Sequence, residues 1–352
     1  MSLDDATLPS RGATANPANR YERLHIELDP EFDDGAQSPT QYFTDASRTV
    51  LAENDSPDVG FRFSLNPYRG CEHGCIYCYA RPSHEYLGFS AGVDFERRIL
   101  VKPQAPELLR RAFAAPGWQP QTIALSGNTD CYQPVERQLR LTRRCLDVCA
   151  EFRNPVSVVT KSALVARDAD VLGELAATGA AEVCVSVTTL DAGLARRMEP
   201  RAARPERRLE AVRLLRAAGV PVAVFVAPVI PGLNDEEIPR ILRAAAAAGA
   251  CSASWQLVRL PQPVDALFID WLDAHFPNRR TRIEGRLRQC RDGRLSDARF
   301  GRRMRGEGTY AQHIASLFRA AVRRYGLDRP LPPLAVEGFR RPAVRGQQLS
   351  LC

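Results

Sequence analysis

Three closely spaced cysteines are the residues whose type and spacing point most clearly to chemistry. Cys71, Cys75 and Cys78 follow the pattern C-x3-C-x2-C. A 4Fe-4S cluster that only transfers electrons normally takes four cysteine ligands. Three thiolates would therefore leave one iron open to a non-protein ligand, as catalytic zinc sites keep an open position.

The residues beside these cysteines extend the pattern. Tyr77 directly precedes the third cysteine, and a predicted strand precedes the whole run. In these features the chain resembles the radical S-adenosylmethionine superfamily, whose signature is C-x3-C-x-aromatic-C. The resemblance implies that Cys71, Cys75 and Cys78 hold a 4Fe-4S cluster whose open iron binds S-adenosylmethionine. It further implies cleavage of that cofactor to a 5'-deoxyadenosyl radical, which abstracts hydrogen from a substrate, and a reductant such as flavodoxin or ferredoxin.

Other kinds of cysteine site fit this run less well. A zinc site would need a fourth Cys or His at a partner spacing, and His73 lies inside the triad, where it could not easily join it. A disulfide framework is typical of small secreted domains, and this chain has 352 residues. A non-catalytic iron-sulfur protein with a redox or structural role remains an alternative.

The composition is that of a globular protein without a membrane-spanning segment. Hydrophobic residues make up 45% of the chain, and the most hydrophobic stretch, 220–230, is interrupted by prolines. The N-terminus MSLDDATLPS lacks the basic and apolar regions of a signal peptide. We therefore expect a cytoplasmic protein with no membrane partner.

Strands and helices alternate through the middle of the chain. Strand patterns occupy 61–65, 121–125, 155–160, 181–188, 220–227 and 252–258, and helical patterns occupy 105–114, 135–151, 163–177, 205–218 and 235–248. This alternation predicts an α/β fold with a parallel sheet. The resemblance implies a partial (β/α)6 barrel of the TIM type, in which the chemistry lies at the carboxyl ends of the strands.

Polar residues follow the predicted strands at those ends. We assign the cofactor's ammonium to Asp130 or nearby carbonyls, its carboxylate to Lys161, its ribose to Ser186 or Thr188, and its adenine to apolar groups near Tyr77. The predicted cofactor-binding residues are Tyr77, Ser126, Asn128, Asp130, Lys161, Ser186 and Thr188. The alternative is that Ser126, Asn128 and Asp130 only shape a turn or cap a helix, and that Lys161 only makes a surface pair.

Within the superfamily, the chain is most similar to the branch of spore photoproduct lyase and related DNA repair enzymes. The matching features are Tyr77 and Tyr79 around the third cysteine, Thr160-Lys161-Ser162, Ser186, and Arg208-Leu-Glu210-Ala211. The resemblance implies catalytic roles for Tyr77, Tyr79 and a hydrogen-donating cysteine. That cysteine is expected before the polar turn of the second strand, but here Cys131 follows Asp130. Cys131 is therefore either a displaced donor or a packed residue, and photoproduct repair is in doubt.

Charge divides the chain unevenly. Residues 1–60 carry twelve acidic residues against four arginines, whereas 279–305 carries eleven arginines against three acidic residues, within a net charge of +7. We predict a disordered or loosely docked acidic arm over 1–40, a core barrel over 41–260 and a basic helical extension over 261–352. The arginines of 279–305 suit a nucleic-acid partner, although a solvated basic surface is an equal alternative. Together with the resemblance to the lyase branch, they make a lyase or transferase acting on nucleic acid the first hypothesis. A protein or small-molecule substrate, with the basic segment docking a partner or the acidic arm, is the alternative.

Overall fold

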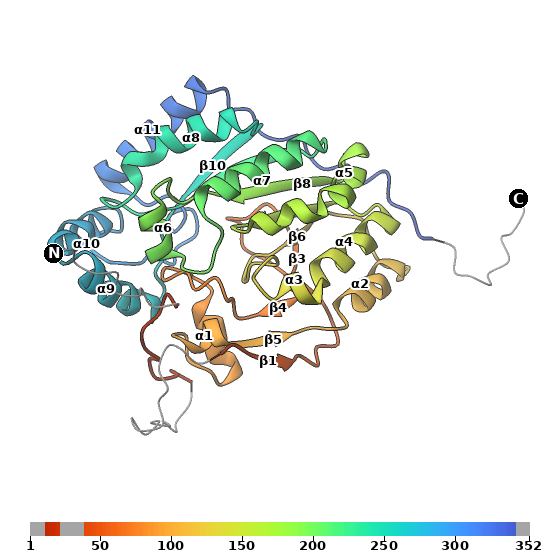
Figure 1. Cartoon of the computed structure of the whole chain (residues 1–352), viewed down its shortest axis with the longest axis horizontal. Helices are drawn as coiled ribbons and strands as arrows, with labels where there is room; N and C mark the ends of the chain where they lie inside the picture. Colours follow the sequence, from red (N-terminus) through yellow and green to blue (C-terminus); the bar gives the residue numbers. More distant parts are fainter. Residues whose placement is uncertain (1–10, 22–38, 343–352) are drawn as a thin grey trace, which may run out of the picture.

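The computed structural model describes residues 11–21 and 39–342, and its centre is a twisted, mainly parallel sheet (Figure 1). The strand order in this sheet is β10-β9-β8-β7-β6-β3-β2. All neighbours are parallel except β2 and β3, which are antiparallel. The strands are β2 (Leu51–Glu53), β3 (Phe63–Leu65), β6 (Ile123–Leu125), β7 (Val156–Thr160), β8 (Ala181–Ser186), β9 (Val222–Val229) and β10 (Ser252–Leu257). Within the described ranges β10 does not pair with β3, so the predicted partial barrel is confirmed as an open one.

Helices connect these strands at the positions that the apolar spacing predicts. They are α2 (Ala105–Ala114), α4 (Leu141–Phe152), α5 (Ala169–Ala177), α7 (Pro205–Ala217) and α8 (Ile238–Ala247). The helix expected over 135–151 is divided into α3 (Glu136–Leu139) and α4, because Arg140 has a left-handed φ of 52°. The helix expected over 163–177 begins as a 3-10 turn, which the Ser162 hydroxyl caps by accepting a hydrogen bond from the Leu164 amide.

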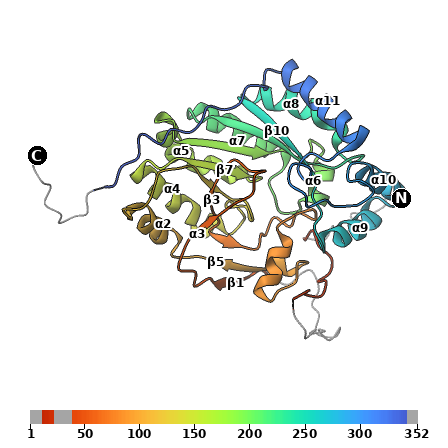
Figure 2. The same cartoon turned by 180° about the vertical axis from the view of Figure 1, so that it is seen from behind.

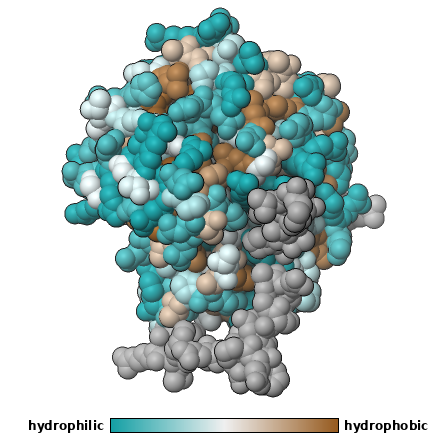
Figure 3. All heavy atoms as spheres, turned by 60° about the vertical axis from the view of Figure 1, so that its left-hand side comes forward, coloured by the Kyte–Doolittle hydropathy of each residue, from teal (hydrophilic) through white to brown (hydrophobic). Residues whose placement is uncertain are grey.

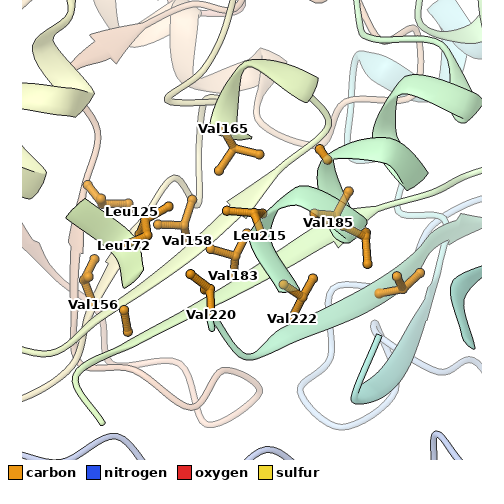
Figure 4. Close-up of a cluster of buried hydrophobic side chains, with 14 of the residues drawn as sticks. Leu125, Val156, Val158, Val165, Leu172, Val183, Val185, Leu215, Val220 and Val222 are labelled. Atoms are coloured by element: carbon orange, nitrogen blue, oxygen red, sulfur yellow. The ribbon is translucent and has the colours of Figure 1, made fainter. Parts of the chain in front are cut away.

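The core forms between the sheet and these helices. Val156, Val158, Val183 and other β-branched residues alternate along the strands, as a pleated sheet with a buried face favours. In Figure 4 their side chains point toward one another and toward Leu172 of α5 and Leu215 of α7. The close packing of this core fixes the positions of the strand ends, where the polar residues lie.

A second, small sheet was not predicted from the sequence. It consists of β1 (Gln41–Thr44), β5 (Arg98–Val101) and β4 (Tyr68–Arg69), with β5 between the other two. β4 closely precedes Cys71, and the short helix α1 (Asp94–Arg97) directly precedes β5. The small sheet therefore fixes both ends of the segment that carries the three cysteines.

The part of the predicted arm that the structure describes is docked. Arg11 and Ala13 are buried, whereas the composition predicts a disordered or loose segment. The reason is that the amides of Gly12 and Ala13 donate hydrogen bonds to the buried Glu96 carboxylate. Residues 1–10 and 22–38 of the predicted arm lie outside the described residues.

The C-terminal third is helical over much of its length. It contains α9 (Val264–His275), α10 (Arg280–Gln289) and α11 (Gly308–Arg324), and residues 343–352 lie outside the described part. Figures 1 and 2 show α11 beside α8, and residues of α11 such as Ile314 belong to the same core cluster as the barrel. The division into arm, barrel and extension thus stays a prediction.

The described surface is mixed in polarity. On the face in Figure 3, hydrophobic residues are interspersed among hydrophilic ones. None of the helices in the described ranges has the length and apolar character needed to cross a membrane.

Candidate cofactor site at the carboxyl ends of the strands

The three cysteines lie on one loop at the carboxyl end of the first parallel strand. Cys71 and Cys75 are buried, Cys78 is half-buried, and all three are free thiols. Burial raises the pKa of each thiol, and for Cys71 the neighbouring Asp130, Cys75 and Cys78 raise it further. The loop therefore presents three neighbouring sulfur atoms that have no disulfide partner among the described residues.

A buried ion pair holds this loop in place. The Arg81 guanidinium is fully buried, donates to the Cys75 carbonyl over 2.9 Å and to the Gly92 carbonyl over 2.8 Å, and pairs with Glu96. Breaking a buried pair of this kind costs about 3–5 kcal/mol, because one charge is left without a partner. The loop conformation therefore depends on Arg81 and Glu96, neither of which was predicted from the sequence.

Glu96 also limits which residue can occupy position 74. Gly74 has a left-handed φ of 66°, and a Cβ placed there would lie 2.6 Å from Glu96 Oε2. Only glycine fits both this conformation and this contact.

Lys161 lies at the centre of the polar strand ends. Its Nζ donates to Ser186 Oγ over 2.6 Å and to the Ala227 carbonyl over 3.0 Å. Its nearest carboxylate oxygen, Glu199 Oε1, is 3.9 Å away. Glu199 already pairs with Arg208, so the Lys161 ammonium has no carboxylate of its own within hydrogen-bonding distance among the described residues.

Asp130 is fully occupied by neighbouring donors. Its oxygens accept from Thr160 Oγ1 over 2.7 Å, from the Tyr132 amide over 2.9 Å and from the Lys161 amide over 2.7 Å, while His73 Nδ1 lies 3.4 Å away. Burial alone would raise the pKa of Asp130, but His73 and these hydrogen bonds outweigh it and lower the pKa to about 2. The Asp130 carboxylate therefore links the cysteine loop, the turn after β6 and the end of β7.

Glu199 is a second buried carboxylate, and it was not predicted from the sequence. It accepts from Thr188 Oγ1 over 2.6 Å, from the Tyr77 hydroxyl and from the Arg208 guanidinium. Burial opposes its charge, but Arg208 and Lys161 outweigh burial and lower its pKa to about 2. This network joins Tyr77 of the cysteine loop to Thr188, which lies just after β8.

The other predicted residues have different surroundings. Ser126 is buried, and its hydroxyl accepts from the Cys131 amide over 3.1 Å. Asn128 is exposed, and its backbone N–H donates to Asn66 Oδ1 over 3.2 Å. Tyr79 is 40% exposed, donates to the Gly127 carbonyl, and has the Arg259 guanidinium 4.9 Å from its ring centroid.

The match to a protein-family model identifies the family. The model described as the radical SAM superfamily matches residues 65–245, a range that contains the cysteine loop and the strand ends described above. The chain belongs to the radical SAM superfamily. The cofactors of this family are a 4Fe-4S cluster and S-adenosylmethionine, and they are the cofactors of this protein.

Its sequence relatives include uncharacterised proteins from bacteria and archaea. One from Mycobacterium tuberculosis is 35% identical over 276 residues, which is 78% of each chain. Another from Methanocaldococcus jannaschii is 29% identical over 184 residues, which is 52% of this chain and 66% of that protein.

Among solved structures, spore photoproduct lyase has a similar fold. A point mutant of that lyase gives a TM-score of 0.59 at 15% identity, covering 81% of this chain and 79% of that one. A double mutant of the same lyase, solved with bound AdoMet and dinucleoside spore photoproduct, gives a TM-score of 0.55 at 16% identity, covering 81% and 78%. At this identity the likeness supports a shared fold.

The donor set of this radical SAM protein fits the cluster. Thiolates are the usual ligands of iron-sulfur clusters, and three free thiols lie together on the loop. No three His, Cys, Asp or Glu side chains converge closely enough to hold a single metal ion in the part of the chain that the structure describes. A cubane does not require that convergence, because each thiolate binds a different iron.

The side chain of Cys131 is packed in the core, although its amide donates to the Ser126 hydroxyl. It is fully buried and belongs to the main hydrophobic core, where burial and the neighbouring Asp130 raise the pKa of its thiol well above the usual value. These surroundings favour the packed interpretation over that of a hydrogen donor.

Proposed function

We propose that the protein binds its cluster through Cys71, Cys75 and Cys78 and uses S-adenosylmethionine for radical chemistry on an organic substrate. The observation that carries this proposal is the position of three free thiols on one loop, beside the Lys161 ammonium and the polar ends of four strands. The chemistry that these cofactors supply when bound is one-electron cleavage of a sulfonium C-S bond, which yields methionine and a 5'-deoxyadenosyl radical for hydrogen abstraction.

Lys161 is the residue that we assign to the cofactor's carboxylate. Its ammonium contacts only neutral oxygens at hydrogen-bonding distance within the described ranges, so an anionic ligand group would complete its coordination. Ser186 and Thr188 are assigned to the ribose, and the hydroxyls of both donate to the Ala227 carbonyl. Asn128, which is exposed, keeps its assignment as a direct contact of the cofactor.

Asp130 and Ser126 act through their neighbours in this proposal, Ser126 through the Cys131 amide. The oxygens of Asp130 already accept four contacts, which is about the number of lone-pair sites of a carboxylate. It therefore positions Lys161 and the cysteine loop rather than binding the ammonium itself. Tyr77 keeps its assignment to the adenine of the cofactor. The Tyr77 ring lies beside Lys161, and Lys161 Nζ is 5.9 Å from the centroid of that ring.

We propose that the substrate is presented at Tyr79, since this phenol follows the last cysteine and is partly exposed. The fold shared with spore photoproduct lyase supports a nucleic acid or nucleotide as substrate, and a lyase as reaction type. A transferase reaction on a protein or another small molecule is the alternative. Flavodoxin or ferredoxin is the proposed reductant, and the cytoplasm the proposed location.

The test is formation of 5'-deoxyadenosine by protein reconstituted without oxygen and reduced with dithionite. Cys71→Ala, Cys75→Ala and Cys78→Ala should each abolish it and lower the bound iron, because a cubane with two protein ligands is unstable. Cys184→Ala, a cysteine on β8 outside the loop, is the matched control and should retain both.

The same assay separates the remaining assignments. Lys161→Met should lower affinity for S-adenosylmethionine while the cluster absorbance stays unchanged, because Lys161 hydrogen bonds to no cysteine. Cys131→Ala should retain 5'-deoxyadenosine formation, and transfer of deuterium from labelled candidates into 5'-deoxyadenosine would identify the substrate. Absence of 5'-deoxyadenosine from cluster-loaded wild-type protein would refute the proposal and favour a non-catalytic redox module.

A further inference from the structure

A cavity lined by arginines lies beside the candidate cofactor site. Its volume is about 590 Å³, and its walls include Arg137, Arg167, Arg201 and Arg207 together with His73 and Ser162. Among the described residues no carboxylate lines it. Four guanidinium groups around one cavity favour an anionic ligand.

The cavity belongs to the same end of the barrel as the cofactor site. Its walls come from the cysteine loop and from the loops and helices that follow β6, β7 and β8. His73 contributes to the wall and lies 3.4 Å from Asp130, and Ser162 follows Lys161 directly in the chain. A ligand in this cavity would therefore lie next to the residues that position the cofactor, which is where a substrate must lie.

Two of the four arginines are already neutralised. Arg167 pairs with Glu136 over 2.8 Å and with Asp168 over 2.7 Å. Arg201 pairs with Glu72 over 3.0 Å.

The other two, Arg137 and Arg207, have no side-chain partner among the described residues and are exposed. The cavity thus offers two guanidinium groups that pair with no carboxylate of the described residues.

We infer that this cavity binds the phosphate group of a phosphorylated substrate, an inference that rests on the proposed function. A phosphate monoester carries a charge of about −1.5 to −2 at neutral pH, which two unpaired guanidinium groups would match. Guanidinium groups form bidentate hydrogen bonds with phosphate oxygens, and the Ser162 hydroxyl is a further donor. The volume lies within the usual range of about 300–1,000 Å³ for small-molecule sites, so a nucleotide-sized substrate would fit.

The test measures binding rather than turnover. Reconstituted protein with an oxidised cluster is first saturated with S-adenosylmethionine, so that a nucleoside cannot occupy the cofactor pocket. This protein is then titrated calorimetrically with inorganic phosphate and, separately, with thymidine 5'-monophosphate. Arg137→Gln and Arg207→Gln should each weaken both probes by about tenfold, as expected for loss of one charged hydrogen-bonding group. Arg243→Gln removes an exposed charge from α8 outside the cavity, and it should change affinity by less than about twofold.

Two outcomes would overturn the inference. One is that neither phosphate probe binds the wild-type protein, or that both bind it and the two cavity variants equally. The other is that a single-stranded oligothymidylate binds with an affinity that Arg137→Gln and Arg207→Gln leave unchanged and Arg294→Gln weakens, which would place the anionic partner on the segment 279–305.

Failure of the proposed function gives a different result. In one result, the wild-type protein forms no 5'-deoxyadenosine but binds phosphate, and the two cavity variants lose that binding. This result would refute radical chemistry and leave an anion-binding cavity. Normal 5'-deoxyadenosine formation together with phosphate binding that is insensitive to both variants would refute the cavity alone.

Discussion

Two arginine-rich regions of this protein differ in how their charges are used. The segment 279–305 contains eleven arginines in a continuous stretch, whereas the cavity beside the cofactor site contains four that come from three different connections between strands. Sequence composition favours the first region as a site for an anionic partner. The contacts of the described residues favour the second.

The arginines of 279–305 are largely bound to the protein itself. Arg299 and Arg302 pair with Asp297 and Glu307 over 2.6 Å each, Arg303 pairs with Asp58, and Arg286 and Arg305 lie over aromatic rings. Arg294 is the one arginine of this segment whose side chain has no partner within the described ranges. A guanidinium group that already has a carboxylate partner must exchange that partner to bind a phosphate, so the count of arginines overstates what this segment offers to nucleic acid. Its predicted contact with nucleic acid stays a prediction.

The largest expected effect concerns an arginine of that segment with a structural role. Arg291 is 2% exposed and donates to the Val258 carbonyl over 2.7 Å and to the Arg302 carbonyl over 3.1 Å. Arg291→Ala should lower the free energy of unfolding by about 3 kcal/mol, because the buried Val258 carbonyl and the partly buried Arg302 carbonyl lose a charged donor and a cavity remains. Urea unfolding measures this change.

The matched control for that variant is Arg294→Ala. This exposed residue should change the free energy of unfolding by less than about 0.5 kcal/mol. If Arg291→Ala left stability unchanged and weakened nucleic-acid binding, the distinction between the two regions would be incorrect.

A smaller effect is expected from Arg167, a cavity arginine that also has a structural role. Arg167 lines the cavity and also pairs with the buried Glu136 and Asp168, while its own side chain is 18% exposed. Arg167→Gln should cost about 2 kcal/mol of stability, below the value for a fully buried pair because of that exposure. Urea unfolding measures this loss as well. The variant should also weaken phosphate binding, which Arg291→Ala should not do in protein that remains folded. A loss of stability without a loss of phosphate affinity would mean that Arg167 acts only as a structural partner.

The smallest effect is expected at an exposed helical pair. Arg288 on α10 pairs with Glu284 over 2.7 Å at a spacing of four residues, and its side chain is 44% exposed. Arg288→Gln should lower the free energy of unfolding by about 0.3 kcal/mol, with the loss decreasing as salt is added. Thermal unfolding at low and high ionic strength measures it. A loss above about 1 kcal/mol at high salt would show that this pair does more than a surface ion pair.

The main sheet and its helices were predictable because their signals are local. Alternating valines mark β7 and β8, and apolar spacing marks α2 and α7, so each element could be located within a few residues. The small sheet was not predictable, since β4 has two residues and its pairing with β5 depends on chain segments that are distant in sequence.

The same distinction applies to the site. The cysteines and the residues that follow each strand could be found from spacing and position. Glu199 could not, because nothing near it in sequence indicates that it pairs with Arg208 beneath Tyr77. The cavity arginines are likewise separated by up to seventy residues of chain, and only the fold brings them together.

The hydrogen bonds around Glu96 have a practical consequence. The amides of Gly12 and Ala13 donate to this carboxylate over 2.9 and 2.8 Å. The same carboxylate pairs with Arg81, which donates to the carbonyl of Cys75, the second cysteine. A shortened expression product that starts after the first dozen or so residues would deprive Glu96 of these donors. Such a truncation would be expected to purify pale and poor in iron even though every cysteine was retained.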